Sequence, residues 1–215
     1  MTGSLRLPDA PVPAEDGRMS APSALRNRAA IVELVARHAP EAGRALEIAS
    51  GTGEHVVALA AALPGLRWHP TDIDAQRRRS IDAWAAAEGL THVAPADDLN
   101  AANPGWSSSE APADLIVLVN LLHLIPESAA KTVLTEIAGC LAPGGVAVIY
   151  GPFLRNGEAT SEGDRAFDAS LRAQDSAIGY KDAAWVRECM TTHGLSSIED
   201  CEMPANNLAF VFRKL

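Results

Sequence analysis

Residues 44–55 read Arg-Ala-Leu-Glu-Ile-Ala-Ser-Gly-Thr-Gly-Glu-His, an apolar run that ends in a Gly-x-Gly turn. A helical pattern follows at once, so the stretch predicts a strand, a tight turn and a helix. Gly51 and Gly53 tolerate positive φ and let a ligand approach the backbone closely. The first N–H groups of the helix are free to bind polar ligand atoms. This order is typical of a nucleotide-binding α/β unit, and an ordinary turn without a ligand is the alternative.

The type of ligand can be narrowed from two positions. A dinucleotide site needs Gly-x-Gly-x-x-Gly, and Val56 stands where the third glycine belongs. Glu47 lies inside the predicted strand and has no role in that fingerprint, but it can face a positively charged amino group. The stretch therefore argues against a nicotinamide dinucleotide and is compatible with a nucleotide-like ligand that carries a positively charged amino-acid moiety.

Strand and helix patterns alternate along most of the chain. Strands are predicted at 44–49, 66–71, 91–96, 114–119 and 146–150, followed by two strands at 195–203 and 208–213. Helices are predicted between them, beginning with one from residue 20 to 40. Such alternation predicts a single α/β domain, with a mostly parallel sheet and helices on both faces. We assign the domain to residues 21–215 and expect residues 1–20 to be a flexible arm.

Ligands of such sheets bind at the carboxyl ends of the strands. Asp72 follows the predicted strand at 66–71, and its two oxygens can accept both hydroxyls of a ribose, although Asp72 or Asp74 can also cap the next helix. Ile73 would then lie against an adenine ring. Asp98, which we prefer over Asp97, can accept a hydrogen bond from the adenine amino group, and the backbone N–H of Leu99 can donate to a ring nitrogen.

Composition and charge exclude several other classes. The net charge is −9, and the single run of basic residues, at 77–79, points in different directions on a helix, which argues against nucleic acid. No apolar stretch has the length of a membrane span. The three cysteines are scattered without a CxxC pair, which is usual for reduced thiols. We expect a cytoplasmic protein with a small-molecule substrate, and leave its oligomeric state open.

Residues 46–53 resemble motif I of class I S-adenosylmethionine (SAM) methyltransferases, Leu-(Asp/Glu)-x-Gly-x-Gly-x-Gly, with Ala49 in place of the first glycine. Further stretches resemble the methyltransferase-like protein 26 family, a bacterial domain of unknown function. They are residues 23–28, 70–74, 120–123, 150–153, 167–172 and 203–208. The resemblance implies a Rossmann-like class I domain with seven strands in the order 3-2-1-4-5-7-6, and SAM as cofactor. The expected cofactor-binding residues are Arg26, Asn27, Glu47, Ala49, Ser50, Gly51, Gly53, Asp72, Ile73, Asp98, Leu99 and Asn120.

The resemblance implies transfer of a methyl group to an oxygen, nitrogen or sulfur atom of a small molecule. His123, one turn past the predicted strand at 114–119, is the candidate base, and Tyr150 can orient the acceptor. Either residue could instead have a structural role. We expect no metal, because Asn120 stands where metal-dependent enzymes of this fold have an acid. Two alternatives remain: a SAM-binding protein without catalysis and, less favoured, a nicotinamide-dependent oxidoreductase.

Overall fold

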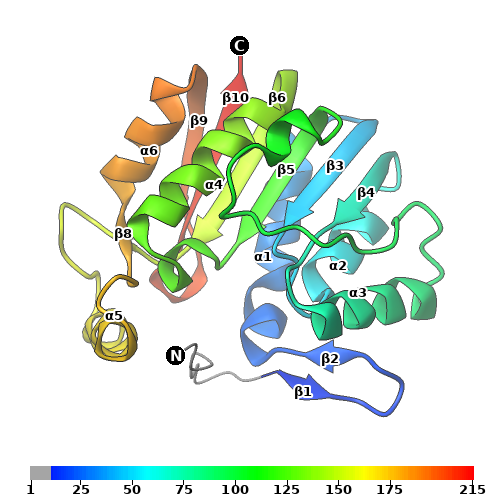
Figure 1. Cartoon of the computed structure of the whole chain (residues 1–215), viewed down its shortest axis with the longest axis horizontal. Helices are drawn as coiled ribbons and strands as arrows, with labels where there is room; N and C mark the ends of the chain where they lie inside the picture. The colour runs from blue at the N-terminus through cyan, green and yellow to red at the C-terminus, as the bar shows by residue number, and fades with distance from the viewer. Residues whose placement is uncertain (1–10) are drawn as a thin grey trace.

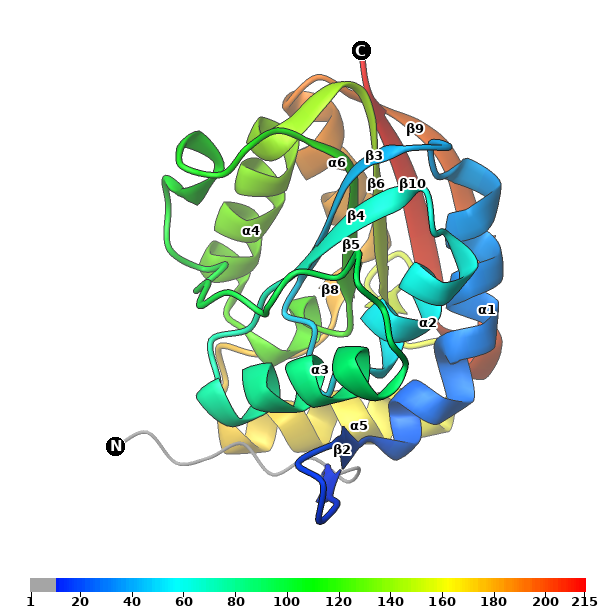
Figure 2. The same ribbon diagram turned by 90° about the vertical axis from the view of Figure 1, so that its right-hand side faces the viewer.

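The computed structural model describes residues 11–215. A six-stranded sheet in the order β4-β3-β5-β6-β10-β9 forms its centre (Figures 1 and 2). The strands are β3 (Gly43–Ile48), β4 (Leu66–Pro70), β5 (Ala113–Val119), β6 (Leu141–Gly151), β9 (Leu195–Glu202) and β10 (Leu208–Lys214). The first four are parallel, and β10 runs antiparallel to both β6 and β9.

Helices cover both faces of this sheet. They are α1 (Pro22–His38), α2 (Glu54–Ala62), α3 (Ala75–Ala87), α4 (Glu127–Cys140), α5 (Glu162–Gln174) and α6 (Ala183–Thr192). Alternate residues of a strand point to opposite faces, so Leu46 and Ile48 pack under α4 and α6, whereas Ala45 packs under α1 and α2. The structure thus confirms the predicted α/β fold, with helices and an apolar layer on each face of the sheet.

The prediction of a seventh strand at residues 91–96 is wrong. Only two isolated parallel bridges, at Val93 and Asp97, join this segment to β4 and the residue that follows it. The Trp68 N–H donates to the His92 carbonyl, and the Trp68 carbonyl accepts the Ala94 N–H. Two residues further along β4, Pro70 has no N–H to continue this ladder. Pro70 therefore interrupts the pairing, and six of the seven expected strands remain, in the order 2-1-4-5-7-6 of the predicted numbering.

The arm predicted at residues 1–20 lies partly outside the described residues. Residues 11–20 form a small hairpin of β1 (Val12–Pro13) and β2 (Met19–Ser20). The N–H of Met19 donates to Ser80 Oγ at 2.7 Å, and the Trp84 indole donates to the Met19 carbonyl at 2.8 Å. Glu54 accepts the Ser20 hydroxyl and the Ala21 N–H, each at 2.8 Å. This part of the expected arm is consequently fastened to α2 and α3.

A smaller layer lies beyond the carboxyl ends of β5 and β6. Two short parallel strands, β7 (Phe153–Leu154) and β8 (Lys181–Asp182), connect it to the domain. Leu171 of α5 packs with Ile178 and Tyr180 in a separate apolar cluster. In Figure 1, α5 lies beyond the ends of the strands, on the side opposite to the C-terminus. No helix in the described part of the chain is both long enough and apolar enough to cross a membrane.

Candidate active site at the strand ends

The turn after β3 carries three residues with left-handed backbone. Ala49 has φ 53°, Gly51 has φ 60° and Gly53 has φ 97°. A Cβ on Gly51 would meet no atom within 4 Å, whereas a Cβ on Gly53 would lie 2.8 Å from the Cα of Ile81. Gly51 thus leaves open space above the turn, and Gly53 is required so that α2 can pack against α3. The left-handed φ of Ala49 also explains why a glycine usually occupies this position.

Ser50 ties the turn to the neighbouring strand end. Its N–H donates to the Thr71 carbonyl at 2.7 Å, and its hydroxyl accepts the Thr71 N–H at 3.2 Å while donating to the Glu47 carbonyl at 3.3 Å. The ends of β3 and β4 are therefore held together at this point by backbone and side-chain bonds. Ser50 is used for this purpose rather than being free for a ligand.

Glu47 is 1% exposed, and its Oε2 has no hydrogen-bond partner among the described residues. Burial raises the pKa of this carboxyl to about 8, and the neighbouring Asp72 adds to the rise while the Ser50 hydroxyl opposes it. Burying an unpaired carboxylate is costly. Glu47 therefore creates a position that a ligand cation would stabilise.

Asp72 follows β4 and is 1% exposed. One carboxylate oxygen accepts the Gly51 N–H and the other accepts the Asp74 N–H, both at 2.9 Å. Burial raises the pKa of Asp72, while these N–H groups and the nearby Arg77 oppose the rise. Asp74 caps α3 by accepting the N–H groups of Gln76 and Arg77. Asp72 thus fixes the glycine turn. The hydroxyls of a bound ribose would donate to the same carboxylate oxygens that already accept these backbone hydrogen bonds.

The remaining predicted adenine contacts lie at the same edge. Ile73 is 59% exposed, which is unusual for so large an apolar side chain. The side chain of Asp98 is 67% exposed and pairs with Arg78 at 3.2 Å. Arg78 also donates to the carbonyls of Asp72 and Ile73, at 2.8 and 3.0 Å, which brings Asp98 to the end of β4. Leu99 is half-buried and packs against the core on the α4 side.

A cavity of about 610 Å³ opens beside this edge. Five predicted site residues line it together, from the start of α1 and the ends of β5 and β6: Arg26, Asn27, Asn120, His123 and Tyr150. The other lining residues come from the start of α1, the segments after β5 and β6, α5, the segment before β8 and the β9–β10 turn: Ser23, Leu124, Pro152, Asp164, Phe167, Tyr180, Pro204, Ala205 and Asn207. The predicted set is thus divided, because Glu47, Gly51, Asp72 and Asp98 do not line this cavity.

Asn27 and Tyr150 form one wall of the cavity. Asn27 is 6% exposed, and its Oδ1 accepts the Nε2–H of His55 at 2.8 Å. Burial lowers the pKa of His55 to about 4, so its imidazole is neutral at pH 7. The buried Tyr150 hydroxyl has no hydrogen-bond partner in the described part of the chain. Burial raises its pKa, with Asn27 and Arg26 opposing, so it stays protonated and can donate to a ligand.

His123 also lines the cavity and is 6% exposed. Its ring meets the edges of Phe167 and Tyr180, each with a centroid distance of 6.0 Å. Burial lowers the pKa of His123 to about 3, the Lys181 ammonium lowers it further and Asp168 opposes this effect. The imidazole is therefore neutral and weakly basic, and it suits a hydrogen bond better than removal of a proton from a weak acid.

Asn120, the last predicted cofactor residue, follows β5 with φ 56°, a conformation that asparagine tolerates better than most residues. Its N–H donates to the Tyr150 carbonyl at 2.9 Å, which joins the ends of β5 and β6. Sequence reasoning missed His55, Asp164, Tyr180 and Lys181 as neighbours of this site. No local pattern marks them, because they reach it through tertiary contacts from elsewhere in the chain.

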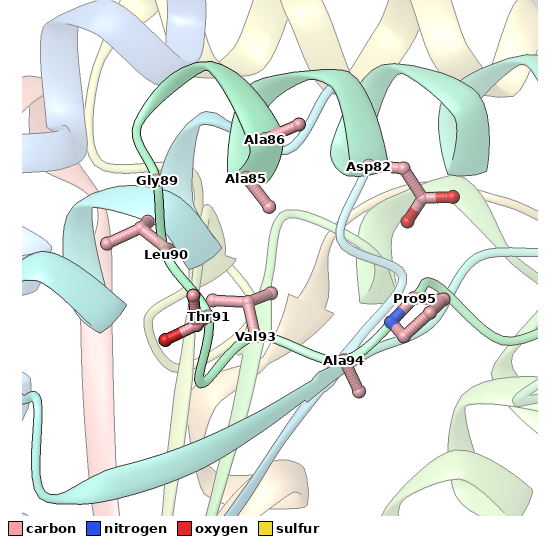
Figure 3. A pocket seen from close by; sticks show the side chains of 9 residues that line it. All are labelled: Asp82, Ala85, Ala86, Gly89, Leu90, Thr91, Val93, Ala94 and Pro95. Carbon is pink, nitrogen blue, oxygen red and sulfur yellow. The ribbon is translucent and has the colours of Figure 1, made fainter.

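A second cavity, of about 470 Å³, lies between α3 and the segment after it (Figure 3). Small apolar side chains line most of it, and its single ionisable side chain, Asp82, accepts the N–H of Ala96 at 2.8 Å. None of the predicted site residues lines it. Within residues 11–215, no group of three or more His, Cys, Asp and Glu side chains could hold a metal ion.

Comparison with solved structures identifies the fold. An O-methyltransferase family protein from Burkholderia thailandensis matches with TM-score 0.75 and 17% identity over 89% of this chain and 57% of that one. Human N-acetylserotonin methyltransferase in complex with SAM matches with TM-score 0.64 and 14% identity over 80% and 47%. The O-methyltransferase family 2 protein from Planctomyces limnophilus, in complex with apigenin, matches with TM-score 0.69 and 18% identity over 80% and 51%. The chain thus spans about half the length of these methyltransferases.

A family model matches almost the whole described chain, from residue 18 to residue 214. That family is described only as a protein of unknown function, DUF938. The chain therefore belongs to the DUF938 family, on a fold that it shares with O-methyltransferases.

Proposed function

We propose that the protein is a SAM-dependent methyltransferase that acts on a small molecule. The observation that carries the proposal is the buried, unpartnered Oε2 of Glu47 below the open Gly51 turn. The adjoining cavity of about 610 Å³, with the unpartnered Tyr150 hydroxyl in its lining, supports a second ligand there. The similarity to the methyltransferase-like protein 26 family belongs to this proposal as well.

The residues present fit SAM. Its ammonium would pair with Glu47, and the ionic contact would favour the ionised carboxylate over the protonated one. The open face of Gly51 would admit the tail, Asp72 would accept the ribose, and Ile73 with Asp98 would border the adenine. When bound there, the cofactor supplies a methyl group on a sulfonium sulfur.

The cavity residues would position the acceptor. Tyr150 donates a hydrogen bond from its protonated hydroxyl, and the neutral His123 accepts or donates one from its ring. Arg26, Asn27 and Asn120 lie on the same lining and would contact the acceptor or the methionine part of SAM. We assign His123 the role of holding the acceptor, because its lowered pKa makes it a poor base at pH 7. Positioning the acceptor for in-line attack is then the main contribution of these residues.

Calorimetry with SAM and with S-adenosylhomocysteine tests cofactor binding. We expect binding by the wild type, and a loss of roughly 10- to 100-fold in SAM affinity for Glu47→Gln, as for a hydrogen bond to a charged group. Glu136→Gln is the matched control, because it removes a buried carboxyl that accepts only the N–H groups of Gly105 and Ser107. Absence of binding to both ligands would refute the proposal.

Incubation with isotope-labelled SAM and a metabolite extract, followed by mass spectrometry, tests the transfer itself. A labelled product that depends on the protein supports a methyltransferase. Binding of SAM without a product from any acceptor pool would support the alternative of a SAM-binding protein without catalysis.

A further inference from the structure

Lys181 of β8 is a buried ammonium that the proposed function leaves unused. The residue is 5% exposed, and its Nζ donates to the carbonyls of Ile125 at 2.9 Å and Gly179 at 2.8 Å. Among residues 11–215, no carboxylate lies within ion-pair distance of it. Because a buried charge without a counter-ion is costly, its retention calls for an explanation.

Hydrogen bonds connect this ammonium to the wall of the cavity. The Gly179 carbonyl accepts the Lys181 Nζ, and the Gly179 N–H donates to the His123 carbonyl at 3.0 Å. The His123 ring lines the cavity between Phe167 and Tyr180 and has no hydrogen-bond partner in the described part of the chain. The positive charge is therefore linked through Gly179 to the backbone of His123, whose ring lines the cavity, and it lowers the pKa of that ring.

The acids near this end of the cavity are occupied by other groups. Asp168 accepts Arg172 Nε at 2.8 Å and the Tyr180 N–H at 2.6 Å. Asp164 accepts the hydroxyls of Thr160 and Ser161 and the Asn206 amide, at 2.9, 2.7 and 3.1 Å. Neither acid forms an ion pair with Lys181.

Other charged residues shift the pKa values of Tyr150 and Lys181. Arg26 lowers the pKa of Tyr150. Arg172 lowers the pKa of Lys181, whereas Glu127 and Asp168 raise it. Burial lowers the pKa of Lys181 to about 8, which still leaves it charged at pH 7. The cavity that His123 and Tyr150 line therefore has two cations near it, Arg26 and Lys181, against the Asp164 carboxylate. It also has a hydrogen-bond donor in the Tyr150 hydroxyl and aromatic rings that suit a planar molecule.

We propose that the acceptor is a planar compound with an acidic hydroxyl, of the phenol or enol class, that reacts as its oxyanion, and that Lys181 is a positioning residue whose charge stabilises this oxyanion. The inference rests on the proposed function. In the transfer, the hydroxyl proton leaves to solvent and the oxygen lone pair forms the bond to the methyl carbon. The methyl–sulfur bond breaks with its electron pair on sulfur, which leaves a neutral thioether.

The test uses a series of phenols of graded acidity, from 4-nitrophenol to 4-methoxyphenol, with cyclohexanol and aniline as other acceptor classes. Methylated product is measured with labelled SAM for the wild type and for Lys181→Gln. The glutamine amide has two N–H donors on a side chain one atom shorter, so the variant removes the charge and retains a polar donor beside these carbonyls. Lys131→Gln, at an exposed position of α4, is the matched control.

We expect methylation of the phenols and not of cyclohexanol or aniline. Lys181→Gln should lower kcat/KM at least 10-fold for the weakly acidic phenols, and less for 4-nitrophenol, which is partly ionised at neutral pH without help from the protein. The pH at which kcat/KM reaches half its maximum should rise in this variant. Lys181→Arg, which keeps the charge, should restore part of the activity, and Lys131→Gln should match the wild type.

Two results would overturn the inference: an equal loss for all phenols with an unchanged pH profile, or methylation of aniline in preference to the phenols. In both cases SAM binding and methyl transfer would persist, so the proposed function would stand. Failure of the wild type to bind SAM in calorimetry would instead remove the proposed function, and the inference with it.

Discussion

Replacing Glu47 with glutamine should stabilise the ligand-free protein, and the gain should grow with pH. The glutamine keeps the size of the side chain and cannot ionise. The pKa of Glu47 rises from 4.5 to about 8 on folding, so the folded state holds this proton more tightly than the unfolded chain does. The wild type is therefore most stable, with respect to this group, below pH 4.5, and it loses stability as the pH rises from 4.5 towards 8.

The size of the effect follows from this shift, because each pKa unit corresponds to about 1.4 kcal/mol. The cost of Glu47 relative to a neutral side chain is about 1 kcal/mol at pH 5, about 3 kcal/mol at pH 7 and about 4 kcal/mol at pH 8. Ser50 is close enough to form a hydrogen bond with the amide as well, so the neutral forms should differ little. These figures are upper estimates, since local relaxation and water entry reduce the penalty of a buried charge.

Urea unfolding of both proteins at pH 5, 6, 7 and 8 measures the difference directly. Titrating groups that do not interact with Glu47 contribute equally to the two proteins and cancel in the comparison. Glu136→Gln provides a control of opposite sign, because hydrogen bonds from Gly105 and Ser107 outweigh burial and lower the pKa of Glu136. A Glu47→Gln gain that is the same at pH 5 and pH 8 would refute the assignment of Glu47 as an unpaired buried acid.

Three further substitutions test the turn and the hairpin. Gly53→Ala should cost about 3 kcal/mol or more of unfolding free energy, because its Cβ would meet Ile81 at 2.8 Å, and thermal unfolding would show this. Gly51→Ala should cost only about 1 kcal/mol of unfolding free energy, because of its positive φ. Calorimetry should show that this variant no longer binds SAM. Normal binding would contradict the idea that SAM lies against the open side of Gly51. Ser80→Ala should cost about 1–3 kcal/mol of unfolding free energy, because the Ser80 hydroxyl accepts the Met19 N–H and donates to the Thr52 carbonyl. Hydrogen exchange at the Met19 amide should become faster. Unchanged exchange would argue against docking of the hairpin on α3.

Much of the fold follows from the local pattern. The apolar run of β5 and the Gly-x-Gly turn after β3 have the periodicity and glycine positions that such elements need. The segment at 91–96 looks equally strand-like in sequence. Its pairing fails because Pro70, on the neighbouring strand, cannot donate, and a pairing partner is a tertiary property.

The site was predictable only where a strand ends in a polar residue. Asn120 and Tyr150 lie at the ends of the adjacent strands β5 and β6, and Asp72 follows β4, on the other side of β3, so the topology alone brings all three to one edge of the sheet. The spacing of the glycines did not reveal that Gly53 is needed for packing and Gly51 for access. The weak basicity of His123 depends on burial among α5 and the residues before β8, which no local pattern contains.

The carboxylate of Glu54 connects the segment before α1 to the turn before α2, two parts of the molecule that are distant in sequence. One oxygen accepts the Ser20 hydroxyl, and the other accepts the Ala21 N–H and the Thr52 hydroxyl. The start of α1, which carries Asn27 to the cavity, is thereby joined to the turn proposed to receive SAM. A ligand that immobilises this turn would also immobilise the start of α1, so cofactor binding and completion of the acceptor cavity would be one cooperative event.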